Sequence, residues 1–378
     1  MLISLFSMII FNYSNYVLTY SLLGIIFIGL TIYYGVLLLL KKSIVKNKRP
    51  VSLVLMALMW LIAFTPFKLF PNYESLIPTG PYTVNHESFW IIEGVSQEGF
   101  SHKSETREIF VECYYGLDNT EERPIVLYSH GGISTPYSNE TLLKELASYG
   151  ITACTMTHPY HTLSAPALNG NTTRIDRSYF NELMKEDVSR DIDESYRLYK
   201  RWMTLRTDDL NVVMDELNRL KYELTFLNTS NLDEIILIGH SLGGSAALCF
   251  LETPNVLAVI ALESPYMCDI ETVNNGVFDY QEIYLGSASL HIYTDSIYHH
   301  LDALPQYKRN LDYISLNARN HQHVLIEGSG HFSITDLGLM SPVLTRLLNQ
   351  FKTTKSNEDT LLEVNDVVRT FIEELLKE

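Results

Sequence analysis

The first seventy residues and the rest of the chain follow different hydrophobic patterns. Residues 1–40 contain no charged side chain, and the apolar stretch 17–40 is long enough, at about 1.5 Å per helical residue, to cross a hydrocarbon layer of about 30 Å. A second apolar run, 51–67, follows the basic stretch "KKSIVKNKRP" (41–50). The pattern predicts a transmembrane helical hairpin, 17–40 and 51–67, within a membrane anchor of residues 1–70. A buried core hairpin is the alternative interpretation.

The short loop between the two runs sets the expected orientation. Short loops rich in lysine and arginine stay on the cytoplasmic side of a membrane. This loop carries Lys41, Lys42, Lys46, Lys48 and Arg49. We therefore expect the loop inside and residues 71–378 outside the cell membrane. The apolar stretch 1–12 is too short to decide whether it inserts as well.

From residue 71 onward, short aliphatic and β-branched runs alternate with amphipathic helical segments. Strands are predicted at 108–115, 124–130, 151–158, 234–240, 256–263, 290–296 and 323–331. Several of these runs are apolar throughout, which is typical of strands buried on both faces of a parallel sheet. A helix at 364–375 and another in the middle of the chain each present one apolar face, the latter with Leu210, Val213, Met214, Leu217 and Leu220. The alternation predicts an α/β fold with a mostly parallel, doubly wound sheet.

The two parts of the chain also differ in the sign of their net charge. Residues 1–70 hold six Lys or Arg and no Asp or Glu, which leaves 22 basic and 44 acidic side chains in residues 71–378. Such an acidic domain is a poor partner for nucleic acid or for an anionic membrane surface. The four cysteines are scattered, and we expect them to be small core residues that form neither a metal site nor a disulfide framework: Cys113, Cys154, Cys249 and Cys268.

The strand run at 234–240 leads into "GHSLGG" (239–244), which matches the G-x-S-x-G pattern of a nucleophile elbow. In such a turn the serine has a strained backbone, and the flanking glycines leave room for the chain to reverse. Ser241 is therefore the candidate nucleophile, and the small residues after it predict a helix packed closely on the sheet. The alternative is that Ser241 only caps the N-terminus of this helix and takes no part in catalysis.

A serine hydroxyl needs a base, and the base needs a carboxylate that orients it. The expected order in this fold is Ser, acid, His. His331 fits the base, because it follows the last strand run on a glycine-rich loop. Two carboxylates end strand runs in between, Glu263 and Asp295, and the pattern alone slightly favours Asp295. The other histidines after Ser241 are expected at the surface: His299, His300, His321 and His323.

From about residue 77 to the C-terminus, the chain resembles the secreted, lipase-like platelet-activating-factor acetylhydrolase family and its bacterial relatives. The resemblance is carried, in order and spacing, by "PTGPYTV" (78–84), "VECYYGLDN" (111–119), "LYSHGG" (127–132), "MTHPYHT" (156–162), "RTDDLNVVMDELNRL" (206–220), "GHSLGG" (239–244), "IALESPY" (260–266) and "GSGHFSITD" (328–336). It implies an α/β-hydrolase fold, with the acid at the end of the strand that follows the nucleophile helix. That residue here is Glu263, where the family usually has Asp, and Asp295 remains the alternative.

Acyl transfer also needs hydrogen-bond donors for the oxyanion. The backbone N–H of Leu242, next to the candidate nucleophile, is the first. The resemblance implies the second at Gly132 in "SHGG" (129–132), for which an ordinary Gly-Gly bend is the alternative. His130 and His158 are expected to brace these loops. The charged stretch 160–206 lies where this fold inserts a cap.

Together, these inferences predict a membrane-anchored serine carboxylic ester hydrolase. Its catalytic domain, 71–378, is expected to lie outside the cytoplasm. No organic cofactor and no metal are expected. The expected partners are a small-molecule or lipid ester and the membrane, and the resemblance implies phospholipids with a short or oxidised sn-2 acyl chain. Two alternatives remain open: a thioesterase or acyltransferase that uses the same triad, and a non-catalytic binding protein tethered to the membrane.

Overall fold

A computed structural model describes residues 13–39, 54, 57–58, 60–61, 65, 68–71, 75–95, 106–283, 286–316, 318–349 and 352–377. The chain divides into two compact units. The smaller comprises residues 1–73 and 340–344, and the larger comprises residues 74–339 and 345–378.

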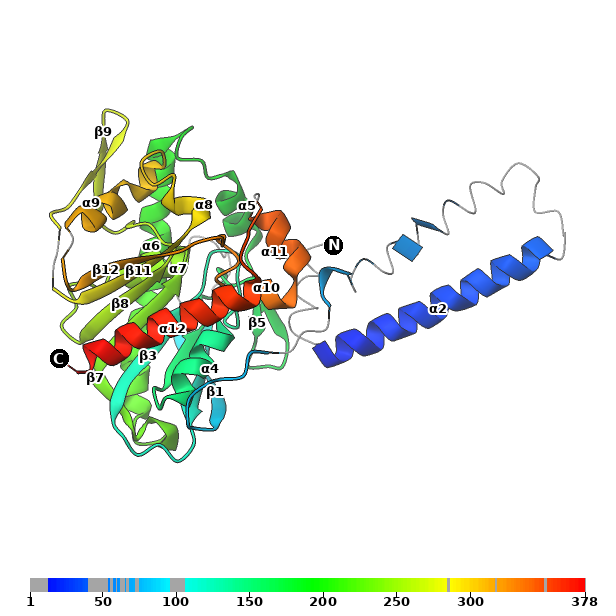
Figure 1. Cartoon of the computed structure of the whole chain (residues 1–378), viewed down its shortest axis with the longest axis horizontal. Helices are drawn as coiled ribbons and strands as arrows, with labels where there is room; N and C mark the ends of the chain where they lie inside the picture. Colours follow the sequence, from blue (N-terminus) through cyan, green and yellow to red (C-terminus); the bar gives the residue numbers. More distant parts are fainter. Residues whose placement is uncertain are drawn as a thin grey trace. The chain divides into compact units, whose positions relative to one another are not determined.

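The larger unit is built on a mixed sheet of eight strands (Figure 1). Across the sheet they are β1 (Val84–Val95), β2 (Thr106–Gly116), β4 (Ala153–Met156), β3 (Arg123–Ser129), β7 (Ser230–His240), β8 (Val256–Leu262), β11 (Ala288–Thr294) and β12 (His321–Ile326). The β1–β2 and β2–β4 pairs are antiparallel, and every pair from β4 to β12 is parallel. All seven predicted strands are present, and the structure adds β1 at one edge.

Helices cover both faces of this sheet. Successive side chains of a strand point to opposite faces, so each buried strand contributes apolar side chains to two cores. On β7, Ile236 and Ile238 pack in the core that α4 (Glu140–Ser148) and α12 (Asn357–Leu375) complete. Leu237 lies between them in sequence and packs in the opposite core, with α6 (Ile192–Leu220) and α7 (Leu242–Leu248). Figure 1 shows α12, in red, crossing the strands on one face. The predicted doubly wound α/β architecture is therefore confirmed.

Shorter elements occupy the connections. The predicted cap-like stretch, 160–206, holds the hairpin β5 (Ser164–Pro166) and β6 (Thr172–Arg174), then α5 (Arg177–Lys185) and the first half of α6. A second hairpin pairs β9 (Ile270–Asn274) with β10 (Val277–Tyr280). The remaining helices are α8 (Asp295–Tyr298), α9 (Lys308–Leu316), α10 (Leu337–Met340), α11 (Pro342–Leu348), and the short 3₁₀ turns η1 (Thr225–Leu227) and η2 (Pro305–Tyr307).

The expectation of four unpaired cysteines is wrong. Cys113 and Cys154 form a disulfide between the paired strands β2 and β4, where they lie directly opposite each other. Cys249 and Cys268 form a second disulfide, between the end of α7 and the segment that follows β8. The partners are 41 and 19 residues apart in sequence, so only the sheet register and the packing of α7 bring them together.

The smaller unit contains α2 (Tyr13–Leu39), whose side chains are described from Leu23 to Val36. The Trp60 indole N–H donates to the Thr31 hydroxyl at 3.0 Å, so the two apolar runs are in contact. Within the part of the chain that the structure describes, no helix has both the length and the apolar character needed to cross a membrane. Residues 1–12 and most of the second predicted span, 51–67, lie outside the described residues. The transmembrane hairpin therefore stays a prediction.

Candidate active site

Ser241 makes the turn between strand β7, which ends at His240, and helix α7, which begins at Leu242. Its φ of 52° and ψ of −123° form a backbone conformation that non-glycine residues seldom adopt. The turn is also tightly packed: a Cβ at Gly239 would lie 2.4 Å from the backbone of Gly243. The geometry is that of the strained elbow which the sequence predicts.

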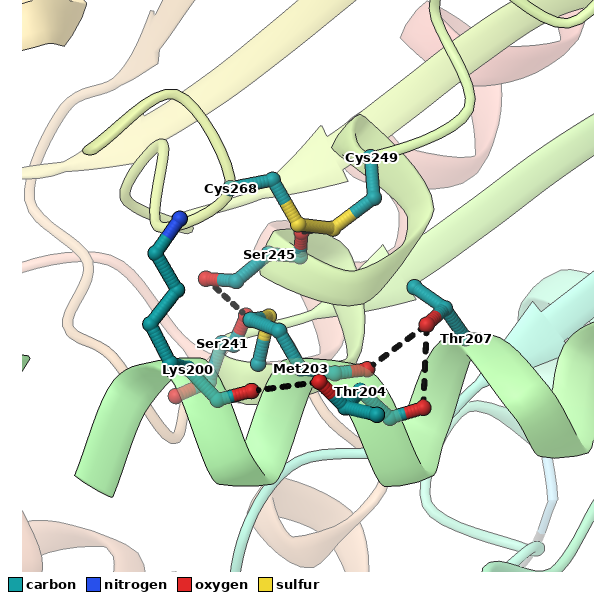
Figure 2. Close-up of a disulfide and its surroundings, with 8 residues drawn as sticks. All are labelled: Lys200, Met203, Thr204, Thr207, Ser241, Ser245, Cys249 and Cys268. Atoms are coloured by element: carbon teal, nitrogen blue, oxygen red, sulfur yellow. Dashed lines mark hydrogen bonds between the residues drawn. A yellow bond between two sulfur atoms is a disulfide. The ribbon is translucent and has the colours of Figure 1, made fainter. Parts of the chain in front are cut away.

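Helix α7 is fixed at both ends (Figure 2). At its start, the Ser241 carbonyl oxygen accepts hydrogen bonds from the Ser245 N–H and hydroxyl, at 3.0 and 3.3 Å. At its far end, the Cys249–Cys268 disulfide ties it to the segment that follows β8. Because β8 leads directly into Glu263, the disulfide links the chain segments that carry the candidate nucleophile and the candidate acid.

The structure brings His331 and Glu263 together. His331 Nδ1 lies 2.7 Å from Glu263 Oε2, and the Glu263 side chain is fully buried whereas that of His331 is 23% exposed. When Nδ1–H donates to the carboxylate, the other ring nitrogen of His331 is left with a lone pair that can accept a proton. The pair therefore has the geometry of a base with its orienting acid.

Donors from the strand end beside β8 hold the Glu263 carboxylate. Its Oε1 accepts the backbone N–H of Thr294 at 2.9 Å and also the Thr294 hydroxyl. The Ser296 hydroxyl lies 3.2 and 3.1 Å from the two carboxylate oxygens, and it accepts the backbone N–H of His331 at 3.1 Å. Ser296 thus contacts both the acid and the backbone of the base. A buried carboxylate needs such partners, because burying it unpaired is costly.

Asp295, the alternative acid, has other contacts. Its Oδ2 accepts the backbone N–H of Gly328 at 2.9 Å, and its Oδ1 lies 3.6 Å from His299 Nε2. Gly328 belongs to the loop that carries His331 and has a φ of +76°. Asp295 therefore supports this loop, and the carboxylate that contacts the His331 ring is that of Glu263.

His240 is a site residue that the sequence reasoning missed, although it occupies the second position of the G-x-S-x-G pattern. Its Nε2 lies 3.1 Å from the His331 carbonyl oxygen, and the centroids of the two rings are 4.6 Å apart. Burial, together with the nearby His331, lowers the pKa of His240 well below its usual value. A neutral His240 then donates its Nε2–H to the His331 carbonyl and positions the backbone of the candidate base.

The turn at 129–132 lies beside the elbow. A Cβ at Gly131 would be 3.6 Å from the Ser241 Cβ, and a Cβ at Gly132 would be 2.9 Å from Leu183 on α5. Among the described residues, no acceptor within the chain takes the backbone N–H of Gly132 or of Leu242. An oxyanion site requires N–H groups that have no acceptor within the chain, and these two lie on segments that meet at Ser241.

The histidines outside the proposed triad have structural contacts. His158 bridges Ser129 and Asp209 at 2.8 and 2.9 Å, and His130 contacts Thr162 at 2.8 Å. Burial lowers the pKa of both imidazoles well below its usual value.

Among the histidines predicted at the surface, His299 and His300 are exposed and His323 is half-buried. The expectation is wrong for His321, which is 5% exposed. Its Nδ1 lies 2.7 Å from the Ser289 hydroxyl of β11, because β12 pairs with that strand.

The sequence matches no protein-family model and no curated protein. Among solved structures, the chain is similar to a ferulic acid esterase from Streptomyces cinnamoneus, with a TM-score of 0.60, 17% identity, and coverage of 80% of this chain and 92% of that one. It also matches a dienelactone hydrolase-like promiscuous phosphotriesterase from metagenomic libraries, with a TM-score of 0.45, 12% identity, and coverage of 77% and 98%. The narrower resemblance to platelet-activating-factor acetylhydrolases stays a prediction. The likeness to the esterase and the mixed, mostly parallel sheet show that the chain has an α/β-hydrolase fold.

Proposed function

We propose that this protein is a serine hydrolase of carboxylic esters that works through an acyl-enzyme at Ser241. The observation that carries the proposal is the 2.7 Å contact between His331 Nδ1 and the buried Glu263 carboxylate, on a fold whose strained elbow presents Ser241. A thioesterase or acyltransferase would use the same groups, but no contact in the described residues favours either one.

In the proposed reaction, His331 accepts the proton of the Ser241 hydroxyl while its oxygen attacks the ester carbonyl carbon. The N–H groups of Leu242 and Gly132 bind the developing oxyanion, and Glu263 stabilises the His331 imidazolium. The C–O bond to the alcohol then breaks, and the alcohol leaves with the proton from His331. Water, activated by the same imidazole, hydrolyses the acyl-enzyme and releases the carboxylic acid.

We infer further that the catalytic domain works outside the cytoplasm, anchored by residues 1–70, on phospholipids with a short or oxidised sn-2 acyl chain. The apolar N-terminal pattern supports the anchor, and the sequence resemblance supports the substrate. The two disulfides support the location, because such bonds persist mainly in oxidising compartments. The oxidation state of the cysteines in protein taken from cells tests the location: two disulfides are expected, and four free thiols contradict it.

Hydrolysis of p-nitrophenyl esters of graded chain length by the purified full-length protein tests the proposed activity. Ser241→Ala is expected to lower turnover by a factor on the order of 10⁶. A fluorophosphonate probe is expected to label Ser241 in the parent protein. The exposed Ser315, whose hydroxyl bonds to the Asp312 carbonyl, provides the matched control, and Ser315→Ala should leave turnover unchanged. An active Ser241→Ala variant, or labelling elsewhere, rules the mechanism out.

A further inference from the structure

We propose that Arg206 is a positioning residue for the oxyanion turn, and that its buried charge makes the Gly132 N–H a stronger donor. The inference rests on the proposed function and adds to it a group that never touches the substrate. Three observations carry it: the contacts of the guanidinium, the geometry of the peptide that it holds, and the charges around it.

The guanidinium holds two consecutive carbonyl groups of the turn at 129–132. Arg206 lies in α6 and its side chain is completely buried. Its Nη1 donates to the His130 carbonyl oxygen at 2.6 Å, and its Nη2 donates to the Gly131 carbonyl oxygen at 3.3 Å. Because the guanidinium is planar and rigid, two such bonds fix the orientation of both peptide planes.

This orientation determines where the Gly132 N–H points. In a trans peptide the N–H of one residue is directed opposite to the C=O of the residue before it. With the Gly131 carbonyl directed at Arg206, the Gly132 N–H points away from α6. A Gly-Gly turn has little conformational preference of its own, so the direction of this N–H depends on the partners of its carbonyls. The Tyr179 hydroxyl adds a third contact, to the Gly132 carbonyl oxygen at 3.4 Å.

The charged groups around Arg206 leave a positive charge next to the Gly131–Gly132 peptide, on the side of its carbonyl oxygen. Asp209, one helical turn further along α6, pairs with Arg107 and contacts His158 at 2.9 Å. Arg206 donates to carbonyl oxygens of the turn, and burial keeps His130 and His158 neutral by lowering their pKa values. In a low-dielectric interior, a cation on a carbonyl oxygen polarises the peptide and strengthens its N–H as a donor. That effect grows as negative charge develops on the substrate oxygen.

Arg206→Lys tests the proposal in the full-length protein, because it keeps the charge and removes the planar fork. Loss of one oxyanion donor costs about 10²–10³ in kcat, so a misdirected donor should lower kcat by about 10–100-fold. KM for a short ester should change less than about threefold, since the interaction belongs to the transition state. A trifluoromethyl ketone, which forms an oxyanion on Ser241, should lose affinity by the same factor as kcat.

Two further variants make the result specific. Arg219→Lys is the matched control, because Arg219 lies on the same helix but its side chain is 57% exposed and pairs with Glu216, so both kcat and ketone affinity should stay unchanged. Arg206→Gln removes the charge as well as the fork and should lower kcat further than Arg206→Lys. Values of kcat are taken per fluorophosphonate-labelled site, so that unfolded protein in a sample does not count.

Several outcomes overturn the proposal. One is an Arg206→Lys variant with kcat within about threefold of the parent; another is a fall in kcat with unchanged ketone affinity. Variants that do not fold and cannot be labelled would assign Arg206 a purely structural role. If the parent protein neither hydrolyses esters nor is labelled at Ser241, the proposed function fails, whereas an active parent with an unaffected Arg206→Lys variant overturns this inference alone.

Discussion

At the scale of single residues, the candidate acid is a glutamate whose surroundings fit its length. The Glu263 carboxylate reaches across from the end of β8 to the end of β11, where the backbone and hydroxyl of Thr294 and the hydroxyl of Ser296 receive it. Glu263 also has a φ of 50°, and its backbone N–H donates to the Ile292 carbonyl oxygen at 2.7 Å. The methylene by which Glu263 is longer than an aspartate therefore places its carboxylate within hydrogen-bonding distance of these donors.

The two candidate acids are expected to respond differently to an amide substitution. Glu263→Gln should lower turnover by a factor on the order of 10⁴, because the amide neither fixes the right imidazole tautomer nor stabilises the imidazolium. Asp295→Asn should retain most of the turnover, since Asp295 contacts the backbone of Gly328. Steady-state ester hydrolysis by both variants decides the matter. An inactive Asp295→Asn variant beside a nearly normal Glu263→Gln variant would transfer the role to Asp295.

The sequence predicted residues that belong to local motifs and missed those defined by distant contacts. Ser241 and His331 could be named because an elbow and a glycine-rich loop are visible within a few residues. Ser296, His240 and Arg206 could not, because their partners in the site are 35, 91 and 76 residues away in the chain. Such contacts follow from the order of strands in the sheet, which no local pattern contains.

At the scale of elements, the buried strands were predictable and the edge strand β1 was not. Residues 235–238 of β7 and all of β8 are apolar because helices cover both faces there, and that leaves a clear signal in the sequence. Strand β1 lies at the edge of the sheet, and residues 85–88 in it are all exposed, so its composition is mixed and carries no such signal. The first half of α6 belongs to the stretch predicted as a cap, 160–206, and it forms one continuous helix of 29 residues with the second half.

The disulfide at the end of α7 should contribute strongly to stability. It closes a loop of 19 residues, and the chain-entropy model gives about 3 kcal/mol for a loop of that size. The double substitution Cys249→Ser and Cys268→Ser should lower the free energy of unfolding by about this amount, measured by urea denaturation. A double variant as stable as the parent would mean that packing alone fixes α7.

At the scale of the whole molecule, buried histidines make stability depend on pH. His291 is 4% exposed, its Nε2 lies 2.8 Å from the Tyr266 hydroxyl, and burial lowers its pKa to about 3. Below pH of about 6.5 the unfolded chain binds a proton at this residue that the folded protein does not bind, so acid favours unfolding. The stability is present above that pH and is lost as the pH falls. Burial raises the pKa of Asp209 and Asp336 to about 7, and these carboxyls act in the opposite direction.

His291→Gln should reduce this pH dependence by one proton. Between pH 7 and pH 5 the parent should lose about 2 kcal/mol of unfolding free energy that the variant keeps, at about 1.4 kcal/mol for each pH unit below 6.5. Urea denaturation of both proteins across that range measures the difference. His300→Gln, at an exposed position, is the control and should follow the parent. Parallel curves for the parent and His291→Gln would show that His291 is protonated in the folded protein.

The order of the cysteines along the chain affects how the protein is made. Each disulfide joins two cysteines that have no other cysteine between them in the chain: Cys113 with Cys154, and Cys249 with Cys268. In a chain that emerges N-terminus first, the first two cysteines to appear are therefore partners, and so are the last two. An oxidant that joins thiols in order of emergence forms both native bonds directly, and no wrong pair needs to be exchanged afterwards. If the protein is made in an oxidising compartment, as we propose, we therefore expect it to need a thiol oxidase but no disulfide isomerase.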